Sequence, residues 1–319
     1  MISAVLAFAA TFLERFIGYP RPVLNVIGHP VMWMGKLIEM LEKRANNTAL
    51  SSVRRRRNGF VMLAILLAAT AFVALAIKLA LRDIPFGWAA EIFIASTLIA
   101  QKELGQAVRA VADGLRDSLA EGRRAVAHIV GRDPEQLDED GVARAAVESL
   151  AENTSDGIIA PIFYLLLFGL PGVAIYKAIN TADSMVGHKN ERFMDFGFAS
   201  AKLDDIANFI PARLTAVIFS LTARFTPDMD GNAAWRSAQR DAKYHRSPNA
   251  GWPEAAMAGA IGVKLGGARA YDGETVDLAT MGEGKDFIEA ADVDRALKLY
   301  NSSLWVTLAA LFVLALFLG

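Results

Sequence analysis

The sequence predicts an all-α protein that passes through a membrane several times. Hydrophobic residues make up 54 % of the 319 residues, and the mean hydropathy of +0.31 is high for a soluble globular protein. These residues are gathered into long uncharged runs instead of being spread over one core, and the alternation typical of strands is weak throughout. We therefore expect roughly four to five membrane segments, some broken or re-entrant, together with cytoplasmic helical regions.

Two segments have the length and composition of simple membrane spans. Residues 58–77 and 299–319 contain no charged side chain, and about 20 apolar residues suffice for a helix to cross a bilayer. We place spans at 58–79 and 300–318, and less regular membrane segments at 1–17, 84–100, 158–179 and 206–224. Segment 158–179 contains the sequence Gly169-Leu170-Pro171-Gly172, which predicts a broken or re-entrant helix.

The charged residues suggest an orientation for one membrane-embedded domain over residues 1–319. Four consecutive arginines at 54–57 precede the first span, and basic residues beside a span mark the cytoplasmic side. Residues 101–156 are amphipathic at helical spacing, with a turn near Gly131-Arg132-Asp133-Pro134, and should be cytoplasmic. We expect 158–179 to return to the same side, and residues 226–298 to be polar and partly loop-like.

Composition excludes several classes of function. The 33 basic and 34 acidic residues give a net charge of −1, whereas a nucleic-acid-binding chain is usually strongly basic. The absence of cysteine excludes disulfides and thiolate metal sites. No GxxxxGK[ST], GxGxxG, GxSxG or HExxH motif is present, so any nucleotide would have to bind through a less common site.

Four polar clusters lie at the edges of apolar segments, where polar groups near a bilayer need partners. The first contains Glu148, Glu152, Asn153 and Asp156, directly before residue 158. Glu148 and Glu152 share a helical face, and a cation or cationic substrate between them would relieve their repulsion. Alternatively, Glu152 is a solvated acid and the residues after it cap the next helix. The sequence leaves both interpretations open.

The second cluster is the densest. Asn180, Asp183 and Ser184 lie at positions i, i+3 and i+4 and project from one helical face. Their oxygen atoms suit a hard cation such as Mg²⁺, and Lys189 and Arg192, which follow, suit phosphate oxygens. The alternative is a helix cap with a solvated basic turn, but so many polar groups between two apolar segments favour a functional site.

The third and fourth clusters are less specific. Asp204 and Asp205 precede the segment 206–224, and such a pair either bridges metal ions or simply favours a helix N-terminus. Asp241 and His245 are four residues apart, so the carboxylate would orient the imidazole as a general base. Ser247 and Asn249 follow in a turn. A structural histidine at a helix end is the alternative.

Three long segments resemble one known family. AVESLAENTSDGIIAPIFY, YKAINTADSMVGHKNERFMDFGFASAKLDDIANFIPARLTA and RDAKYHRSPNAGWPEAAMAGAIGVKLGG resemble, in order, the adenosylcobinamide-phosphate synthase family of cobalamin biosynthesis (the CobD/CbiB type). Gly18-Tyr19-Pro20, the run 28–31 and Gly35 resemble its opening. The chain departs from the pattern at Tyr19, where Asp is common, at His188, where Tyr is common, and at Lys202, where Arg is common. The departure at Tyr19 weakens any metal-binding role for that position.

The resemblance implies a multi-pass enzyme of the bacterial inner membrane, with its active site facing the cytoplasm. Such an enzyme joins aminopropanol, or its phosphate, to the propionate carboxylate of adenosylcobyric acid, and the amide product is adenosylcobinamide (phosphate). ATP and Mg²⁺ are the implied cofactors. The implied partners are the corrinoid, the amine and membrane lipid. The resemblance also allows other membrane-bound cobalamin-assembly enzymes as partners, whereas nucleic acid is not an expected partner.

The clusters and the resemblance together give each candidate residue an expected role. Asp183, Asp204 and Asp205 would hold Mg²⁺, and Lys189 would neutralise charge on the phosphoryl oxygens. Glu152 or His245 would accept a proton from the attacking amine. The expected substrate-binding residues are His29, Asn153, Asp156, Asn180, Ser184, Arg192, Ser247 and Asn249.

Two other functions remain as alternatives. Broken helices also occur in transporters that bind substrate near the bilayer midplane, so the chain would be a transporter or carrier of a corrinoid. Against this, the polar clusters lie at segment ends, and the two halves of the chain have no matching hydropathy. A non-catalytic structural or sensory role would not need the intact clusters. The choice between free and phosphorylated aminopropanol is left open.

Overall fold

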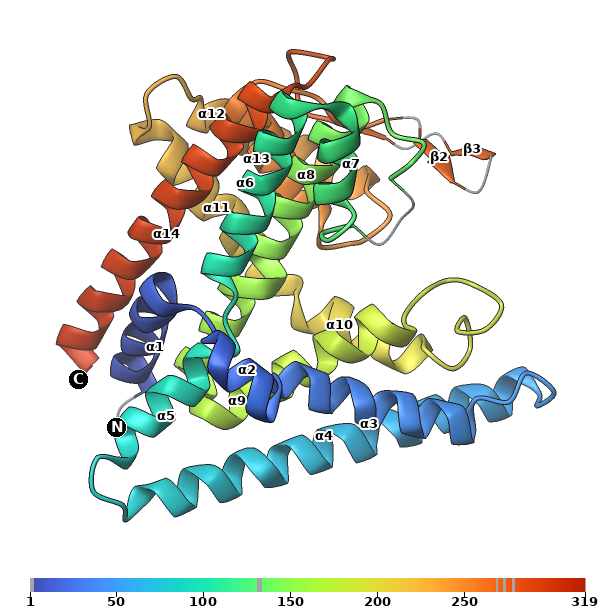
Figure 1. Ribbon diagram of the computed structural model, residues 1–319, viewed down its shortest axis with the longest axis vertical. Helices are drawn as coiled ribbons and strands as arrows, with labels where there is room; N and C mark the ends of the chain where they lie inside the picture. Colours follow the sequence, from blue (N-terminus) through green and yellow to red (C-terminus); the bar gives the residue numbers. More distant parts are fainter. Residues whose placement is uncertain (1–2, 131–133, 268, 272–273, 277–278, 319) are drawn as a thin grey trace. The chain divides into compact units, whose positions relative to one another are not determined.

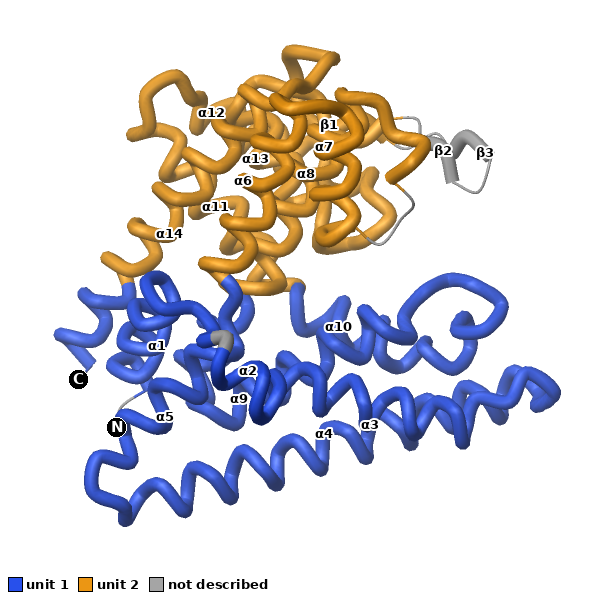
Figure 2. The backbone as a smooth tube through the Cα atoms, viewed as in Figure 1, with its two compact units in different colours: residues 1–100, 160–208, 311–319 blue, residues 101–159, 209–310 orange. Residues whose placement is uncertain are grey.

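The computed structural model describes residues 3–130, 134–267, 269–271, 274–276 and 279–318. Helices dominate it, and the strands are two or three residues long (Figure 1). The chain divides into two compact units (Figure 2). Unit 1 contains residues 1–100, 160–208 and 311–319, and unit 2 contains residues 101–159 and 209–310. The predicted all-α class is confirmed.

Unit 1 is a group of helices packed around an apolar core. Its helices are α1 (Ser3–Ile17), α2 (Arg21–Ile27), α3 (Pro30–Ala45), α4 (Ser52–Arg82), α5 (Gly87–Ser96), α9 (Ala160–Val186) and α10 (Phe198–Ala207). The core lies where α3, α4, α9 and α10 meet, because each of these helices buries an apolar stripe there. Its largest members include Ile38, Met62, Leu66 and Phe196.

A glycine sets the closest approach within this core. The Cβ of any side chain at Gly59 would lie 1.9 Å from the carbonyl oxygen of Phe196. Helix α4 therefore touches the backbone of the segment before α10 directly, which only a residue without a side chain permits.

Unit 2 is built around one buried helix. Its helices are α6 (Gln101–Asp117), α7 (Leu119–Val126), α8 (Glu139–Thr154), the π-helical turn η1 (Ser155–Ile159), α11 (Phe209–Phe225), α12 (Gly231–Asp241), the 3₁₀ turn η2 (Ala242–Tyr244) and α13 (Gly251–Ile261). Helix α13 is buried except at Trp252 and packs against α8, α11 and α12. The region 226–298, which we expected to be polar and partly loop-like, thus contains a central apolar helix. Small side chains in the sequence AAMAGAI allow this close packing.

Short strands follow α13. β1 (Leu265–Gly266) pairs antiparallel with β4 (Thr280–Met281), and Leu265 lies opposite Met281. β2 (Arg269–Tyr271) pairs antiparallel with β3 (Glu274–Val276), and Arg269 lies opposite Val276. Helix α14 (Ala290–Leu318) ends the described chain, with residues up to 310 in unit 2 and the rest in unit 1.

The helices include candidate membrane spans, as the sequence predicts. Among the described residues, three helical runs are long and apolar enough: Ser52–Arg82, Glu139–Val186 and Ala290–Leu318. They contain the spans expected at 58–79, 158–179 and 300–318. Only 22 % of the most apolar window of α4 is buried, so this helix leaves most of its apolar surface to contact lipid. A polytopic membrane protein is therefore confirmed.

Three expected segments have shorter helices. α11 and α10, which flank Asn208, count as a fourth span only when taken together. α1 has 15 residues and α5 has 10. At 1.5 Å per residue, α5 is about 15 Å long, half of a hydrocarbon core, so it does not cross a membrane by itself. That segments 1–17, 84–100 and 206–224 lie in the membrane stays a prediction.

The break expected in 158–179 is present in α9. Gly169 has φ 66° and ψ −155°, which is not helical, and Pro171 follows within the same helix. Because proline cannot donate a backbone hydrogen bond and glycine accepts this conformation, the two residues interrupt the helix together. A broken helix is confirmed, whereas the return of the chain to one side of the membrane stays a prediction. Of the turn expected at 131–134, residues 131–133 lie outside the described residues.

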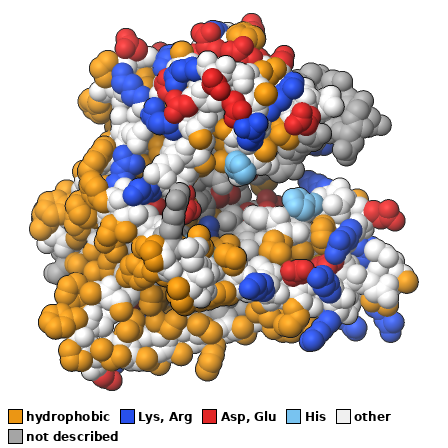
Figure 3. All heavy atoms as spheres, in the orientation of Figure 1, with side chains coloured by type: hydrophobic (Ala, Val, Ile, Leu, Met, Phe, Trp, Pro, Cys, Tyr) orange, Lys and Arg blue, Asp and Glu red, His pale blue; other side chains and the backbone are white. Residues whose placement is uncertain are grey.

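The surface of unit 1 is divided by residue type. Figure 3 shows apolar side chains over the part of this face that contains α5 and the C-terminal end of α4, and basic side chains around the other end of α4. Arg54, Arg56 and Arg57 are exposed at that N-terminal end. This distribution agrees with a span whose basic end lies in water.

Gly59→Ala tests the contact between α4 and Phe196. The added methyl group overlaps the Phe196 carbonyl, so we expect the free energy of unfolding to fall by roughly 1–3 kcal/mol. Thermal or denaturant unfolding of the detergent-purified protein measures this change. Val61→Ala, at an exposed position one half-turn away, is the control and should have little effect. Equal unfolding midpoints for the two variants would show that the close approach is absent.

Candidate functional site

Four of the predicted site residues come together in unit 1. Asn180 and Asp183 lie in the last turns of α9, and Asp204 and Asp205 lie in α10, which packs against α9. We call these four residues the aspartate cluster. Asp204 is 9 % exposed, while Asp183 and Asp205 are half-buried. Asn180 and Asp183 lie in one helix, as the sequence suggested, and α10 brings the carboxylates of Asp204 and Asp205 to them.

Hydrogen bonds fix the orientation of Asp204. The Asn208 side-chain amide donates to Asp204 Oδ2 at 2.9 Å, and Asn180 donates a further side-chain hydrogen bond to the same carboxylate. The hydroxyl of Tyr176, on α9, in turn donates to Asn208 Oδ1 at 2.8 Å. Asp204 is thus held from both helices, as carboxylates at binding sites commonly are.

Sequence reasoning missed the supporting residues. Tyr164 stacks on Tyr176 with 5.0 Å between ring centroids, and its hydroxyl donates to the Ala207 carbonyl at 3.0 Å. Asn208 lies between α10 and α11 and is 1 % exposed. The available signal was a set of polar side chains inside apolar segments, because such groups are buried only when they have partners.

The electrostatics of the aspartate cluster favour a positively charged ligand. The carboxylate of Asp183 repels those of Asp204 and Asp205. Asp204 Oδ1 is buried and has no hydrogen-bond partner among the described residues. The ammonium group of Lys202 lies 3.1 Å from Asp205 Oδ2, and His188 offsets part of the charge of Asp183. An unpartnered buried oxygen beside a second carboxylate is an arrangement that a cation would complete.

The cluster does not form a complete metal site by itself. Within the described ranges, no group of three or more His, Asp or Glu side chains is spaced to hold a metal ion. Asp183, Asp204 and Asp205 therefore do not make a three-carboxylate site. Mg²⁺ often binds through one or two carboxylates and takes its remaining oxygens from water and phosphate. The donor set fits that pattern, and Mg²⁺ at this position stays a prediction.

Arg192 has a partner outside the aspartate cluster. Its guanidinium forms two hydrogen bonds with Glu42 of α3, at 3.1 and 2.9 Å. Arg55, the one buried arginine of the block 54–57, donates to the carbonyls of Glu191 and Arg192. Asn46 joins Glu42 to the Arg192 carbonyl. We call Glu42, Asn46, Arg55 and Arg192 the loop clamp, since they fix residues 187–197 to α3 and α4.

The clamp changes the interpretation of two sequence features. The Arg192 guanidinium already binds a carboxylate, so a phosphate would have to share or replace that contact; its substrate-binding role stays a prediction. Arg55 donates hydrogen bonds to the loop. The arginine block therefore has a structural role in addition to indicating the orientation of the span. Lys189 is exposed within the clamped loop, where it is available to an anionic ligand.

Two further candidates in unit 1 have local structural contacts. The Ser184 hydroxyl donates to the Asn180 carbonyl at 2.9 Å, within its own helix. His29 caps the N-terminus of α3, and its Nδ1 accepts the Val31 N–H at 3.2 Å. The Tyr19 ring packs edge-on against His29, with 4.7 Å between centroids. Substrate binding by Ser184 or His29 stays a prediction.

The candidates of the first cluster lie in unit 2. Glu148 is buried and accepts the Gly266 N–H at 2.8 Å, which ties α8 to β1. Glu152 and Asn153 are exposed, and the Asn153 amide donates to the Ser149 carbonyl at 2.9 Å. Asp156 is half-buried in η1. Glu148 is therefore structural, and Glu152 is the acid of this pair that faces solvent.

The expected pairing of Asp241 with His245 is wrong. Helix α12 ends at Asp241 and a 3₁₀ turn follows, so positions 241 and 245 do not share a helical face. Both Asp241 oxygens bond to Arg240, at 2.6 and 2.7 Å, and Oδ2 also accepts the Gly282 N–H. His245 Nε2 instead lies 3.6 Å from Glu254 Oε1, on α13.

The turn after His245 is well ordered by its own side chains. Ser247 Oγ accepts the N–H groups of Asn249 and Ala250, both at 3.2 Å. Asn249 is 5 % exposed, and its Oδ1 accepts a hydrogen bond from Arg213 of α11 at 3.2 Å. The Arg213 guanidinium lies over the rings of Phe209 and Trp252. Arg213 is another residue that sequence reasoning missed.

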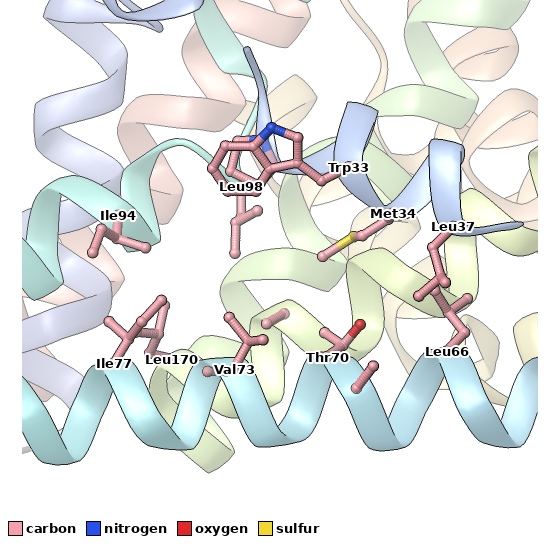
Figure 4. Close-up of a pocket in the computed structure, with 14 residues that line it drawn as sticks. Trp33, Met34, Leu37, Leu66, Thr70, Val73, Ile77, Ile94, Leu98 and Leu170 are labelled. Carbon is pink, nitrogen blue, oxygen red and sulfur yellow. The ribbon is translucent and has the colours of Figure 1, made fainter. Parts of the chain in front are cut away.

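A separate pocket in unit 1 has no group suited to acid–base chemistry. It is about 200 Å³ in volume and lies between α3, α4, α5 and α9. Figure 4 shows Trp33, Met34, Val73 and Leu98 around it, and the hydroxyl oxygen of Thr70 is drawn in red. Because its walls are apolar and belong partly to a candidate membrane span, the pocket is not a candidate for the reacting site.

The loop clamp should make stability depend on pH. Burial raises the pKa of Glu42, but hydrogen bonds from Arg192 and Asn46 outweigh this effect and hold the pKa below its ordinary value. A carboxyl with a depressed pKa stabilises the fold above its unfolded pKa, and this contribution is lost as the pH falls through the folded pKa. Glu42→Gln should therefore lower the melting temperature at pH 7, and the difference from wild type should shrink below about pH 4.

The control for this prediction is Glu39→Gln on the same helix. Glu39 pairs with Lys43 in the open, where an ion pair contributes little. Melting temperatures of the two variants between pH 3 and 7 measure the contrast. A constant difference between Glu42→Gln and wild type over this range would contradict the prediction.

Comparison with known proteins shows which family the chain belongs to. The family described as CobD/Cbib protein matches residues 7–300. The chain is 49 % identical over 310 residues to "Cobalamin biosynthesis protein CobD" of Brucella anthropi, covering 95 % of this chain and 94 % of the relative. A protein with the same name from Halalkalibacterium halodurans is 41 % identical over 317 residues, covering 98 % and 97 % of the two chains. No solved structure matches. The chain belongs to the CobD/CbiB family of cobalamin biosynthesis proteins.

Proposed function

We propose that this chain catalyses ATP-dependent amide formation between aminopropanol, or its phosphate, and the propionate carboxylate of adenosylcobyric acid. The observation that carries the proposal is the aspartate cluster, in which mutually repelling carboxylates and one unpartnered buried oxygen favour a cation. Membership of a cobalamin biosynthesis family supplies the substrate class. The family resemblance of the clusters supplies the reaction.

The chemistry requires activation of a carboxylate, which is a poor electrophile. In the proposed reaction, a corrinoid carboxylate oxygen attacks the γ-phosphorus of ATP, and ADP leaves. The amine nitrogen then attacks the acyl carbon, loses a proton, and expels inorganic phosphate. Mg²⁺ held by Asp183 and Asp204 would neutralise the charge of the nucleotide phosphates.

Other residues have the properties that their expected roles need. Asn180 and Asn208 keep the Asp204 carboxylate in one orientation, so little reorganisation is needed when a charged ligand binds. Lys189 is exposed on the loop that the clamp holds at residues 191 and 192. Glu152 and His245, the two candidate proton acceptors, both belong to unit 2.

We further propose that the protein lies in the bacterial inner membrane with its reacting groups facing the cytoplasm. The support is the exposed basic N-terminus of α4, which precedes a candidate span. The chain has no cysteine, so single cysteines introduced near residue 195 would report the side of the membrane by labelling. Labelling from the periplasmic side alone would contradict this orientation.

Asp183→Asn tests the proposed reaction directly. Asparagine keeps the shape of the side chain but removes its charge, so cation binding should weaken and amide formation should fall on the order of 10²-fold or more. The assay supplies adenosylcobyric acid, each amine in turn, ATP and Mg²⁺ to the detergent-purified protein, and detects the amide by mass spectrometry. Glu191→Gln, an exposed acid in the clamped loop, is the control and should retain activity. Full activity of Asp183→Asn would show that amide formation does not need a cation bound by Asp183.

Gly187 offers a test that keeps every carboxylate in the sequence but moves one of them. A Cβ at this position would lie 1.8 Å from Asp183 Oδ1, so Gly187→Ala must displace the Asp183 side chain. We expect a higher Mg²⁺ concentration for half-maximal activity and a lower kcat. In the control Gly35→Ala, the new Cβ meets the flexible end of Met185 at 3.3 Å, which moves easily. An unchanged Mg²⁺ requirement in Gly187→Ala would show that Asp183 does not bind the cation.

The alternative is a carrier or transporter of a corrinoid, and the broken helix α9 is the observation that favours it. The same assay distinguishes the two functions. Saturable corrinoid binding without product, with either amine and in the presence of ATP, would support the carrier.

A further inference from the structure

The apolar pocket of unit 1 has a buried floor and an exposed rim. Leu66, Leu98 and Leu170, which form the floor, are between 0 and 4 % exposed. Trp33 and Val73, which form the rim, are 49 % and 52 % exposed. The pocket is therefore a cavity of about 200 Å³ that opens on the surface of the protein.

Apolar side chains face one another across the pocket. Figure 4 shows Met34 of α3 on one side and Val73 of α4 on the other. Among the described side chains that line the pocket, only Thr70 and Trp33 have a polar atom, and the Trp33 N–H already donates to the Ile27 carbonyl at 2.8 Å. A ligand in this pocket is therefore held by burial of apolar surface instead of by hydrogen bonds.

The position of the pocket along α4 decides which molecules reach it. The α4 residues in its wall extend from Leu66 to Ile77, and this stretch lies inside the uncharged run 58–77. Because α4 is a candidate membrane span, the pocket lies at the depth of the hydrocarbon core when α4 crosses the bilayer. At that depth, the surrounding medium consists of acyl chains and contains no water.

The apolar surface of α4 continues beyond the rim of the pocket. Phe72 and Leu75, which do not line the pocket, are 74 % and 49 % exposed on either side of Val73 in the helix. Only 22 % of the most apolar window of α4 is buried, so lipid covers such side chains in a membrane. A chain from the bilayer therefore enters the pocket without crossing water.

Two other occupants fit the pocket less well. The corrinoid and the amine of the proposed reaction have carboxylate, ammonium or hydroxyl groups, which would be left without partners between apolar walls. A helix from a second copy of this chain is about 10 Å across with its side chains, which is too wide for a cavity of about 200 Å³. A single unbranched hydrocarbon chain has neither of these disadvantages.

We propose that the pocket between α3, α4, α5 and α9 binds one acyl chain of a bilayer phospholipid. The chain packs on the buried floor, and Trp33 and Val73 border the opening through which it enters. The phospholipid headgroup stays outside the pocket. Because the chain binds only the folded protein, it raises the stability of unit 1. This inference concerns contacts within unit 1 and does not depend on amide formation.

Trp33 provides an optical probe at the rim. A phosphatidylcholine with bromine atoms on its chains quenches tryptophan fluorescence on contact. When this lipid is titrated into the detergent-purified full chain, we expect saturable quenching that ordinary phosphatidylcholine reverses by competition. Trp33→Phe removes the probe, so the saturable part of the quenching should disappear. This loss would assign the signal to the pocket and not to the other tryptophans of the chain.

Two substitutions on α4 distinguish the pocket from the surface that faces lipid. Ala69 lines the pocket, so Ala69→Phe places a ring inside it. Ala68→Phe places the same ring on the exposed surface beside it and is the control. The half-saturating lipid concentration should rise on the order of 10-fold or more in Ala69→Phe and stay unchanged in Ala68→Phe. Val73→Phe, at the exposed rim, is a second blocking variant if Ala69→Phe folds poorly.

Melting temperatures provide a measurement that is independent of fluorescence. Added phosphatidylcholine should raise the melting temperature of the wild type and of Ala68→Phe, since a ligand of the folded state stabilises it. The increase should be smaller in Ala69→Phe, where the ring takes the place of the chain.

Three results would overturn the inference. Quenching that does not saturate, or that is the same in Trp33→Phe, would show that no chain binds at the rim. Equal half-saturating concentrations in Ala68→Phe and Ala69→Phe would place the bound lipid elsewhere on the surface. A changed oligomeric state of Ala69→Phe with unchanged lipid binding would show that the pocket belongs to an interface between copies of the chain.

Discussion

The candidate site depends on one constraint: a carboxylate placed among apolar helices must have fixed hydrogen-bond donors. Asp204 satisfies it through Asn208 and Asn180, and Asn208 is itself fixed by Tyr176. This chain of contacts joins α9 to the end of α10, so the same bonds that hold the helices together also aim the carboxylate. The other oxygen of this carboxylate, Asp204 Oδ1, is one of several buried side-chain atoms without a hydrogen-bond partner among the described residues, and a bound cation would supply its partner.

Backbone groups are subject to the same requirement. The loop 187–197 has little regular structure, so its carbonyl groups need donors from elsewhere. Arg55 provides them for residues 191 and 192, and Glu42 and Asn46 complete the clamp. The loop that follows Asp183 therefore has a definite path without being helical. Neutral polar side chains in the interior of unit 1 position the aspartate cluster. Buried Glu42 and Arg55, together with Asn46, fix the loop.

The sequence predicted what depends on local spacing and missed what depends on distant contacts. Uncharged runs predicted the long helices, and Gly169 with Pro171 predicted the break, because both effects act within one turn. The partner of Arg192 lies 150 residues away in α3, and no periodicity reveals such a pair. The proposed Asp241–His245 pair was wrong because the helix ends between the two residues. Glu254 was overlooked because a single acid in an apolar segment has no recognisable spacing.

The break at Gly169 has an electrostatic consequence for α9. An unbroken helix has one macrodipole, with its partial charges at the two ends. A helix interrupted at Gly169 has two shorter dipoles, and the carbonyl end of the first lies inside the apolar run rather than at its edge. The ammonium group of Lys78, near the end of α4, lies beside Gly169, 3.5 Å from the position of a Cβ there. A lysine late in an apolar helix thus compensates the negative pole created by a break in its neighbour.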